Sequence, residues 1–280
     1  GKLLRYTMVH DFVAGDYMWT GIDYLGEANW PQRSAGCGCL DTCGFEKDAF
    51  YFYKSVWNQN EKFAYLCPHW NLKLEKGTVL PVICYTNCED AELFVNGRSF
   101  GMKSKGFPCY GMTERYGHFD RYRRPANTDD LFLSWDVPYE PGKIEVVGYH
   151  DGKEVCRYKV ETTGEAASIK LTVDKTSVDA DGRSIVQAEV RIVDSEGRLV
   201  FNACPELDFT LEGDAKIIGI DNGDPACHEQ WKETKGRHAF NGMAYAVIRA
   251  GQNKGELTLT VQASGVDAAI GKASVTISQK

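Results

Sequence analysis

Across most of the chain, apolar and polar side chains alternate with a period of two, the pattern of β-strands with one face in water. The first stretch of this kind begins near residue 64. Its turns are marked by Asn96-Gly97, which favours a type I′ hairpin, and by Asp151-Gly152. Short strands separated by such turns predict an immunoglobulin-like β-sandwich over residues 64–163. The expected inward positions of its strands are Ala91, Leu93, Val95, Ile144, Val146 and Gly148.

A second set of alternating strands begins near Gly164, after a small and polar link at residues 162–167 that is typical of a domain boundary. The remaining length is close to the ~100 residues of an immunoglobulin-like sandwich, so we predict a second one over residues 164–280. The expected inward positions are Ile169, Leu171, Val173, Val186, Ala188, Val190, Ile192, Leu257, Leu259, Val261, Ala263, Val275 and Ile277.

Residues 1–63 have a different pattern, with a predicted strand followed by a predicted helix. Apolar residues from Ala49 to Val56 recur with the spacing of one helical face, and Glu46 and Asp48 favour a helix start there. The apolar run at residues 12–20 predicts a buried strand. A single βα unit cannot bury both faces of its strand, so this segment is an odd start or the last piece of something larger.

Without neighbouring strands, the side chains of Phe12, Met18 and Trp19 are expected to be exposed or to be buried in a foreign contact. We therefore expect residues 1–63 by themselves to be poorly ordered, or to attach to a sandwich or to a second copy of the chain.

Composition and charge narrow the classes of protein. The chain has 280 residues with 32 basic and 39 acidic side chains, a net charge of −7, which argues against a nucleic-acid binder. It has no apolar run near the ~18 residues of a membrane span. The first residues, Gly1 to Arg5, lead into no signal-peptide core. Because there is no initial Met, we expect a piece of a longer protein.

Ten cysteines are many for a cytosolic enzyme, but the chain is too long to be built around disulfides. Cys37, Cys39 and Cys43 form a C-x-C-x3-C cluster, and no second close pair follows as in a zinc site. We interpret the cysteines as apolar or free thiols, with a disulfide as the open alternative. We expect no metal and no cofactor. The cysteine count does not settle the redox compartment, and the expected location is the periplasm or outside the cell.

The stretch from Phe12 to Trp30 combines aromatic residues with carboxylates, among them Trp19, Asp23 and Glu27. A pyranose has an apolar face that stacks on aromatic rings and hydroxyls that donate to carboxylates, so this stretch indicates a carbohydrate site. The alternative is a buried strand end whose acids are satisfied within the protein.

Several motifs resemble β-galactosidase-like glycoside hydrolases of family two, in family order. W-T-G-x-D-Y-L-G-E at residues 19–27 resembles the eighth strand of their TIM barrel, and G-F-x-K-D-x-F-Y-x-Y at residues 44–53 resembles the last barrel helix. The hairpin at residues 91–99 and the strand and turn at residues 133–142 resemble the first sandwich after the barrel. Residues 221–225 and 239–242 resemble the last sandwich.

This resemblance implies a mainly β chain, in which a βα remnant of a TIM barrel at residues 1–63 precedes the two sandwiches. It implies a parent that is a retaining exo-β-glycosidase acting on terminal β-galactosides, with two catalytic carboxyl groups ~5–5.5 Å apart. In this family both are glutamates on earlier barrel strands, so this sequence is expected to hold no catalytic residue and to act as a scaffold.

Trp19 matches the tryptophan that would wall the sugar pocket, and Asp23 matches the acid four residues later, a structural or pocket-rim residue. These two are the predicted substrate-binding residues. Glu27 falls in the loop after the strand, so we do not assign it a catalytic role. The implied partners are the rest of the barrel in the parent, a carbohydrate substrate and a second copy of the chain.

Two alternatives stay open, a non-catalytic carbohydrate-binding module and a surface-adhesion module of immunoglobulin-like units. The aromatic and basic insertion at residues 102–130, which includes Tyr116 and Tyr122, suggests a lid over a sugar, a loop packed on a domain, or a stacking surface for bases. The Asn222-Gly223-Asp224 turn offers too few oxygens for calcium, so we interpret it as a plain turn.

Overall fold

The structure is a computed structural model that describes residues 1–105 and 131–280. These residues form a mainly β protein with two compact units, which are described separately. Unit 1 comprises residues 1–21 and 46–162, and unit 2 comprises residues 22–45 and 163–280. Residues 1–63 are thus divided between the units. The lid hypothesis for residues 102–130 falls almost entirely outside the described residues.

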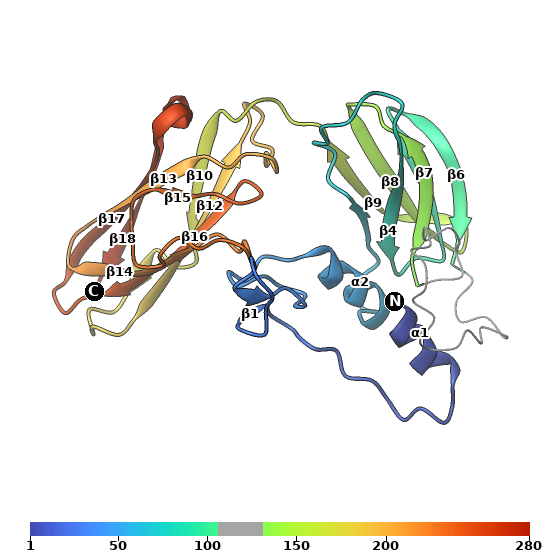
Figure 1. The fold of residues 1–280 in the computed structure, drawn as a ribbon, viewed down its shortest axis with the longest axis horizontal. Coiled ribbons are helices and arrows are strands. Elements are labelled where there is room, and N and C mark those ends of the chain that lie inside the picture. The colour runs from blue at the N-terminus through green and yellow to red at the C-terminus, as the bar shows by residue number, and fades with distance from the viewer. Residues whose placement is uncertain (106–130) are drawn as a thin grey trace. The chain divides into compact units, whose positions relative to one another are not determined.

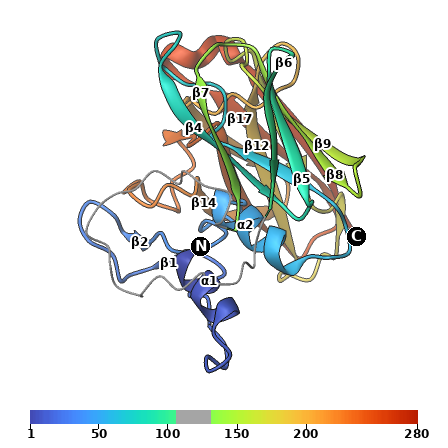
Figure 2. The same ribbon diagram turned by 90° about the vertical axis from the view of Figure 1, so that its right-hand side faces the viewer.

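Unit 1 contains two antiparallel sheets with a shared core (Figures 1 and 2). The three-stranded sheet has the order β3-β4-β7, with β3 at Ala64–Cys67, β4 at Val79–Thr86 and β7 at Leu133–Pro138. The four-stranded sheet has the order β6-β5-β8-β9, with β6 at Arg98–Ser104, β5 at Asp90–Val95, β8 at Lys143–His150 and β9 at Lys153–Glu161.

The predicted strands of unit 1 are confirmed, and so are their turns. Alternate positions of β5, from Ala91 to Val95, are buried in the core. At the β5–β6 hairpin, Asn96 and Gly97 have φ of 49° and 81°. Two successive positive φ values define the type I′ turn, whose twist matches that of the flanking strands.

The described residues of unit 1 form two α-helices, and only one of them is predicted. Helix α2, Asp48–Trp57, forms where the apolar spacing indicates and packs on β3 and β4 (Figure 1). Helix α1, Lys2–Val9, has Gly1 at its N-cap and no capping side chain, so its start carries no sequence signal. The described helices are not long and apolar enough to cross a membrane.

The prediction of a buried strand at residues 12–20 is wrong. This segment has no strand conformation, and the side chains of Phe12 and Trp19 are 76% and 72% exposed. A strand with two apolar faces is stable only between neighbouring strands, and no described strand pairs with this one. The exposure of Phe12 and Trp19 is the result expected for the segment without such neighbours.

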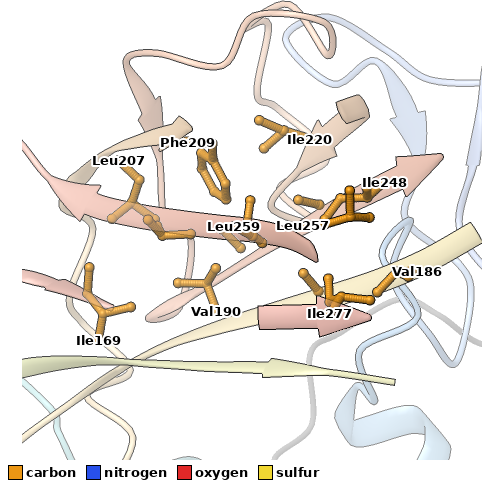
Figure 3. Packing of buried hydrophobic residues seen from close by; sticks show 14 of the residues in the cluster. Ile169, Val186, Val190, Leu207, Phe209, Ile220, Ile248, Leu257, Leu259 and Ile277 are labelled. Atoms are coloured by element: carbon orange, nitrogen blue, oxygen red, sulfur yellow. The ribbon is translucent and has the colours of Figure 1, made fainter. Parts of the chain in front are cut away.

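Unit 2 is also built from two sheets, with a core between them (Figure 3). One has the order β10-β12-β16-β14, with β10 at Ser168–Val173, β12 at Ile185–Val193, β16 at Met243–Ala250 and β14 at Ala215–Asp221. The other has the order β11-β18-β17-β13-β15, with β11 at Ser177–Val178, β18 at Lys272–Gln279, β17 at Gly255–Ala263, β13 at Glu206–Glu212 and β15 at Arg237–His238. A 3-10 helix, η1, spans Gly265–Ile270.

The predicted inward positions of β12 and β17 are confirmed as core. Val190 and Leu259 are fully buried, and Figure 3 shows their side chains pointing into the space between the sheets. Residues 22–45 add a two-stranded ribbon to this unit, made of β1, Tyr24–Leu25, and β2, Ser34–Ala35.

Asp194 holds the start of unit 2 to the turn after β12. Its buried carboxylate accepts hydrogen bonds from the backbone N–H groups of Gly164, Glu196 and Arg198 at 2.9–3.0 Å, and from Arg198 Nε at 2.8 Å. Burial raises the pKa of Asp194, but the hydrogen bonds from the Arg198 guanidinium and the backbone lower it by more. The net shift of the pKa is therefore downward.

Replacing Asp194 by asparagine should make the free energy of unfolding depend less on pH in the acid range. The native-state pKa lies below the unfolded value of ~3.9, so the ionised group stabilises the fold fully above that value. That contribution is lost as the pH falls through the native-state pKa. The free energy of unfolding, measured by urea denaturation, should therefore fall less between about pH 5 and pH 2 in Asp194→Asn than in the wild type. The exposed-site control Asp179→Asn should keep the wild-type slope, and equal slopes for Asp194→Asn and the wild type would contradict the assignment.

Candidate functional site

Trp19, the first of the two predicted site residues, lies in the irregular segment between α1 and α2 of unit 1. Its side chain is 72% exposed and its peptide bond to Thr20 is cis. An accessible indole has an apolar face that can stack on the C–H face of a sugar ring. The local structure is therefore compatible with a binding role, which stays a prediction.

Asp23, the second predicted residue, is buried in unit 2 and ties two backbone segments together. Its Oδ1 accepts a hydrogen bond from the N–H of Gly38 at 2.6 Å, and its own N–H donates to the carbonyl of Leu40 at 2.9 Å. Gly38 has to be glycine, because a Cβ there would lie 2.3 Å from the backbone nitrogen of Asp23. This carboxylate thus stabilises the turn at Cys37–Leu40. Trp19 belongs to unit 1 and Asp23 to unit 2.

Glu27 lies in the turn between β1 and β2, at a φ of 47°. Its carboxylate accepts a hydrogen bond from the hydroxyl of Tyr24 in the same turn. Glu27 thus lies in a turn, but the strand expected to precede it at residues 12–20 has no strand conformation.

Sequence analysis missed the ion cluster around Asp221, at the end of β14. Its Oδ1 is 3.0 Å from Nη2 of Arg33 and 2.6 Å from Nη2 of Arg237. Its Oδ2 accepts a hydrogen bond from the hydroxyl of Thr42 at 3.1 Å. One carboxylate therefore joins two positions of the 22–45 segment to the sandwich of unit 2.

Arg237 is the buried cation of this cluster, with only 1% of its side chain exposed. Its Nη1 donates to the carbonyl of Glu229 at 3.0 Å, and its Nε lies 3.6 Å from the Glu229 carboxylate. Glu229 also contacts Nδ1 of His238 at 2.6 Å. A buried guanidinium is tolerated only when carboxylates and carbonyls surround it in this way.

Asp41 orders the turn at residues 41–45 and lies against Gly223 of the sandwich. Its Oδ1 accepts hydrogen bonds from the N–H groups of Cys43 and Phe45 at 2.8 and 2.9 Å. Burial raises the pKa of Asp41, and these backbone donors oppose the shift only in part. A Cβ on Gly223 would lie 2.0 Å from this carboxylate, so the close approach requires glycine there. Gly223 has a φ of +77°, as expected for a plain turn at residues 222–224.

A hollow of about 260 Å³ lies beside this cluster, within unit 2. Its lining includes His228, Glu229, Gln230, Glu233, Lys235 and Arg237. Ligand pockets are usually larger, ~300–1,000 Å³, and mostly apolar, so this hollow does not resemble a substrate pocket. Aromatic rings lie close to the same cluster: Trp30 packs on His228 with centroids 4.9 Å apart, and Arg33 lies over Trp231.

Among the described residues of unit 1, one group of side chains has the atoms to ligate a metal. The ligand atoms of Glu89, His150 and Asp151 lie within 4.8 Å of one another at an exposed hairpin. Nδ1 of His150 is 3.1 Å from the Glu89 carboxylate, a contact that is an ion pair when the imidazole is protonated.

Comparison with known proteins assigns the chain to a family. Residues 169–271 match the model described as glycoside hydrolase family 2 C-terminal domain 5, and residues 77–156 match a domain of unknown function, DUF4982. Over 279 residues, 97% of the chain, the sequence is 35% identical to the β-galactosidase BoGH2A of Bacteroides ovatus. The chain belongs to glycoside hydrolase family 2.

Other similar proteins are also glycosidases by name. A β-glucuronidase of Formosa agariphila is 30% identical over 218 residues, 71% of this chain. A β-glycosidase structure from Bacteroides vulgatus matches 99% of the chain with a TM-score of 0.82 and 31% identity. A family 2 structure from Bacteroides cellulosilyticus matches 98% of the chain with a TM-score of 0.83 and 27% identity.

The chain spans only part of each family 2 relative. It covers 29% of the Bacteroides ovatus protein, 20% of the Formosa agariphila protein, and 32% and 37% of the two solved chains. It corresponds to a C-terminal portion of a family 2 protein, as the motifs at residues 19–27 and 221–225 predict.

Within this family 2 chain, removing the carboxylate of Asp221 should destabilise unit 2 strongly. Asp221→Ala leaves the buried Arg237 without its nearest carboxylate, at an expected cost of ~3–5 kcal/mol in the free energy of unfolding. Urea denaturation measures this cost, and limited proteolysis should cut residues 22–45 faster. The exposed-site control Asp179→Ala should change stability by less than about 0.5 kcal/mol. A similar small effect for Asp221→Ala would show that the ion cluster does not stabilise the unit.

Proposed function

We propose that this chain is the non-catalytic C-terminal part of a retaining exo-β-glycosidase that removes terminal β-galactosides. The observation that carries the proposal is the 35% identity to a β-galactosidase across 97% of the chain. The match to a solved β-glycosidase along 99% of the chain supports the broader activity.

In this proposal residues 1–63 are the last strand and helix of a TIM barrel, and the units carry two immunoglobulin-like sandwiches. The partners are the rest of the barrel in the parent protein, a carbohydrate substrate and a second copy of the chain. The sandwiches brace the barrel rim or the dimer. The proposed location is the periplasm or outside the cell.

The exposed indole of Trp19 supports its proposed role as a wall of the sugar pocket. The apolar run around it, which includes the exposed Phe12, would then be covered by the other strands of the barrel. For Asp23 the contacts within unit 2 support a structural role, because its carboxylate accepts from the N–H of Gly38 and orders that turn.

The chemistry of the reaction requires residues from outside this sequence. Retention needs a nucleophile and an acid/base about 5–5.5 Å apart on either side of the glycosidic bond. The family resemblance assigns both glutamates to earlier barrel strands. The acids that sequence analysis singled out here have other contacts: Asp23 holds a backbone turn and Glu27 pairs with Tyr24.

The 280-residue chain alone should therefore not hydrolyse p-nitrophenyl β-galactoside. The transition state resembles an oxocarbenium ion and needs both carboxyl groups. Release of p-nitrophenol is followed with the chain at high concentration, and the complete natural protein serves as the positive control. Turnover that follows the purified 280-residue chain through gel filtration would overturn the proposal.

In the complete protein, Trp19→Ala should lower kcat/KM for the galactoside by about 10- to 200-fold, the effect of losing one apolar contact with the substrate. Trp57→Ala is the matched control, because Trp57 is also exposed but lies on α2 against Tyr53. In a separate measurement on the wild type, NMR of the sugar anomer released first tests whether the anomeric configuration is retained. Equal kcat/KM for the wild type and Trp19→Ala would remove Trp19 from the pocket.

A second candidate substrate is a β-glucuronide, because a relative with 30% identity is named a β-glucuronidase. A glucuronide differs from a galactoside in the configuration of its C4 hydroxyl and in carrying a C6 carboxylate, which a site recognises with a charged donor such as arginine. The ratio of kcat/KM for p-nitrophenyl β-galactoside and β-glucuronide in the complete protein separates the two. If both are inert while the chain binds on a glycan array, the carbohydrate-binding alternative replaces the enzyme.

A further inference from the structure

Two cysteine sulfurs meet in the core of unit 1, away from the proposed sugar site. Sγ of Cys88 lies 3.5 Å from Sγ of Cys156. Cys88 is in the short connection between β4 and β5, and Cys156 is in β9. The two cysteines are 68 residues apart in sequence, and the four-stranded sheet brings them together.

Gly148 in β8 makes the space for this pair. It pairs with Ala91 of β5 on one side and with Cys156 of β9 on the other. A Cβ on Gly148 would lie 2.6 Å from each of the two sulfurs. Position 148 therefore has to be glycine, because any side chain there would clash with the two sulfurs. The two thiols fill the space that such a side chain would occupy.

The backbone around Cys88 fixes its sulfur in this position. The Cys88 N–H donates to the hydroxyl of Thr86 at 3.0 Å, and that hydroxyl donates to the carbonyl of Phe63. The Cys88 thiol also lies 3.8 Å from the same carbonyl. A disulfide needs the sulfurs at ~2.05 Å, so they must approach by about 1.5 Å, a motion within reach of side-chain rotation.

We propose that Cys88 and Cys156 are a disulfide-forming pair that is oxidised by a small-molecule disulfide such as oxidised glutathione. The pair loses one proton, and the resulting thiolate, held mainly by Cys88, attacks one sulfur of the oxidant to give a mixed disulfide and one glutathione thiolate. The sulfur of Cys156, which is partly exposed, then displaces the second glutathione. One S–S bond forms in the protein, one breaks in the oxidant, and the two thiol protons end on two molecules of glutathione.

The electrostatics of the pair support this step. The hydrogen bond from Cys156 lowers the pKa of the Cys88 thiol to about 6, against the opposing effect of burial, and the pKa of Cys156 is raised in turn. The two thiols share one titration, so the pair loses its first proton more readily than an isolated thiol. Burial instead raises the pKa of the neighbouring Cys84 to about 12, so that thiol stays protonated.

The test is a mass-spectrometric map of the native chain after equilibration with oxidised glutathione, blocking with N-ethylmaleimide and digestion with trypsin. The expected product joins tryptic peptides 77–98 and 154–157 and weighs two hydrogens less than their sum. Since peptide 77–98 holds both Cys84 and Cys88, variants assign the bond. Cys84→Ala should keep the linked peptide, whereas Cys88→Ala and Cys156→Ala should lose it.

The bond should also raise the melting temperature of the oxidised wild type by roughly 5–15 °C, since it closes a long loop in the unfolded chain. Gly148→Ala, with a Cβ against both sulfurs, should slow bond formation. If Cys88 and Cys156 of the native wild type are instead each recovered with maleimide or glutathione, the proposal is overturned. That measurement decides even where a variant fails to fold.

Discussion

The half-buried carboxylate of Asp221 is the contact on which the arrangement within unit 2 depends. It accepts from two guanidiniums, Arg33 of the 22–45 segment and Arg237 of β15, at 3.0 and 2.6 Å. A buried arginine without a partner is far more costly than an exposed one, so Arg237 is stable only with Asp221 in place. The same carboxylate therefore stabilises the core edge and keeps the ribbon of β1 and β2 on the sandwich.

This dependence explains how the acids of residues 22–45 are used. Asp23 accepts from the N–H of Gly38, and Asp41 accepts from the N–H groups of Cys43 and Phe45. Backbone N–H groups in an irregular segment need acceptors that no sheet supplies, and short carboxylates provide them. Asp23 and Asp41 are thus structural acceptors within unit 2.

Local patterns predicted most of the sheets, because alternation, hairpin turns and helical spacing are written within a few residues. The turn at Asn96-Gly97 and the buried face of β12 are examples. The ion cluster was not predictable, since Arg33 and Asp221 are 188 residues apart and nothing nearby marks either one. Helix α1 was missed because it has no cap, and residues 12–20 were misassigned because an apolar run implies burial only when partner strands exist.

The contrast between the sandwiches and residues 12–20 bears on what the chain can do alone. In each sandwich, side chains from two facing sheets bury one another, as Val82 and Leu93 do in unit 1 and Val190 and Leu259 in unit 2. Phe12, Tyr17 and Trp19 are the opposite case, with large apolar surfaces left in water. Exposed apolar side chains grouped in one segment mark a surface that another element covers. In the proposed parent, the rest of the barrel would cover this segment. It would also supply the two catalytic carboxyl groups that act on a sugar beside Trp19.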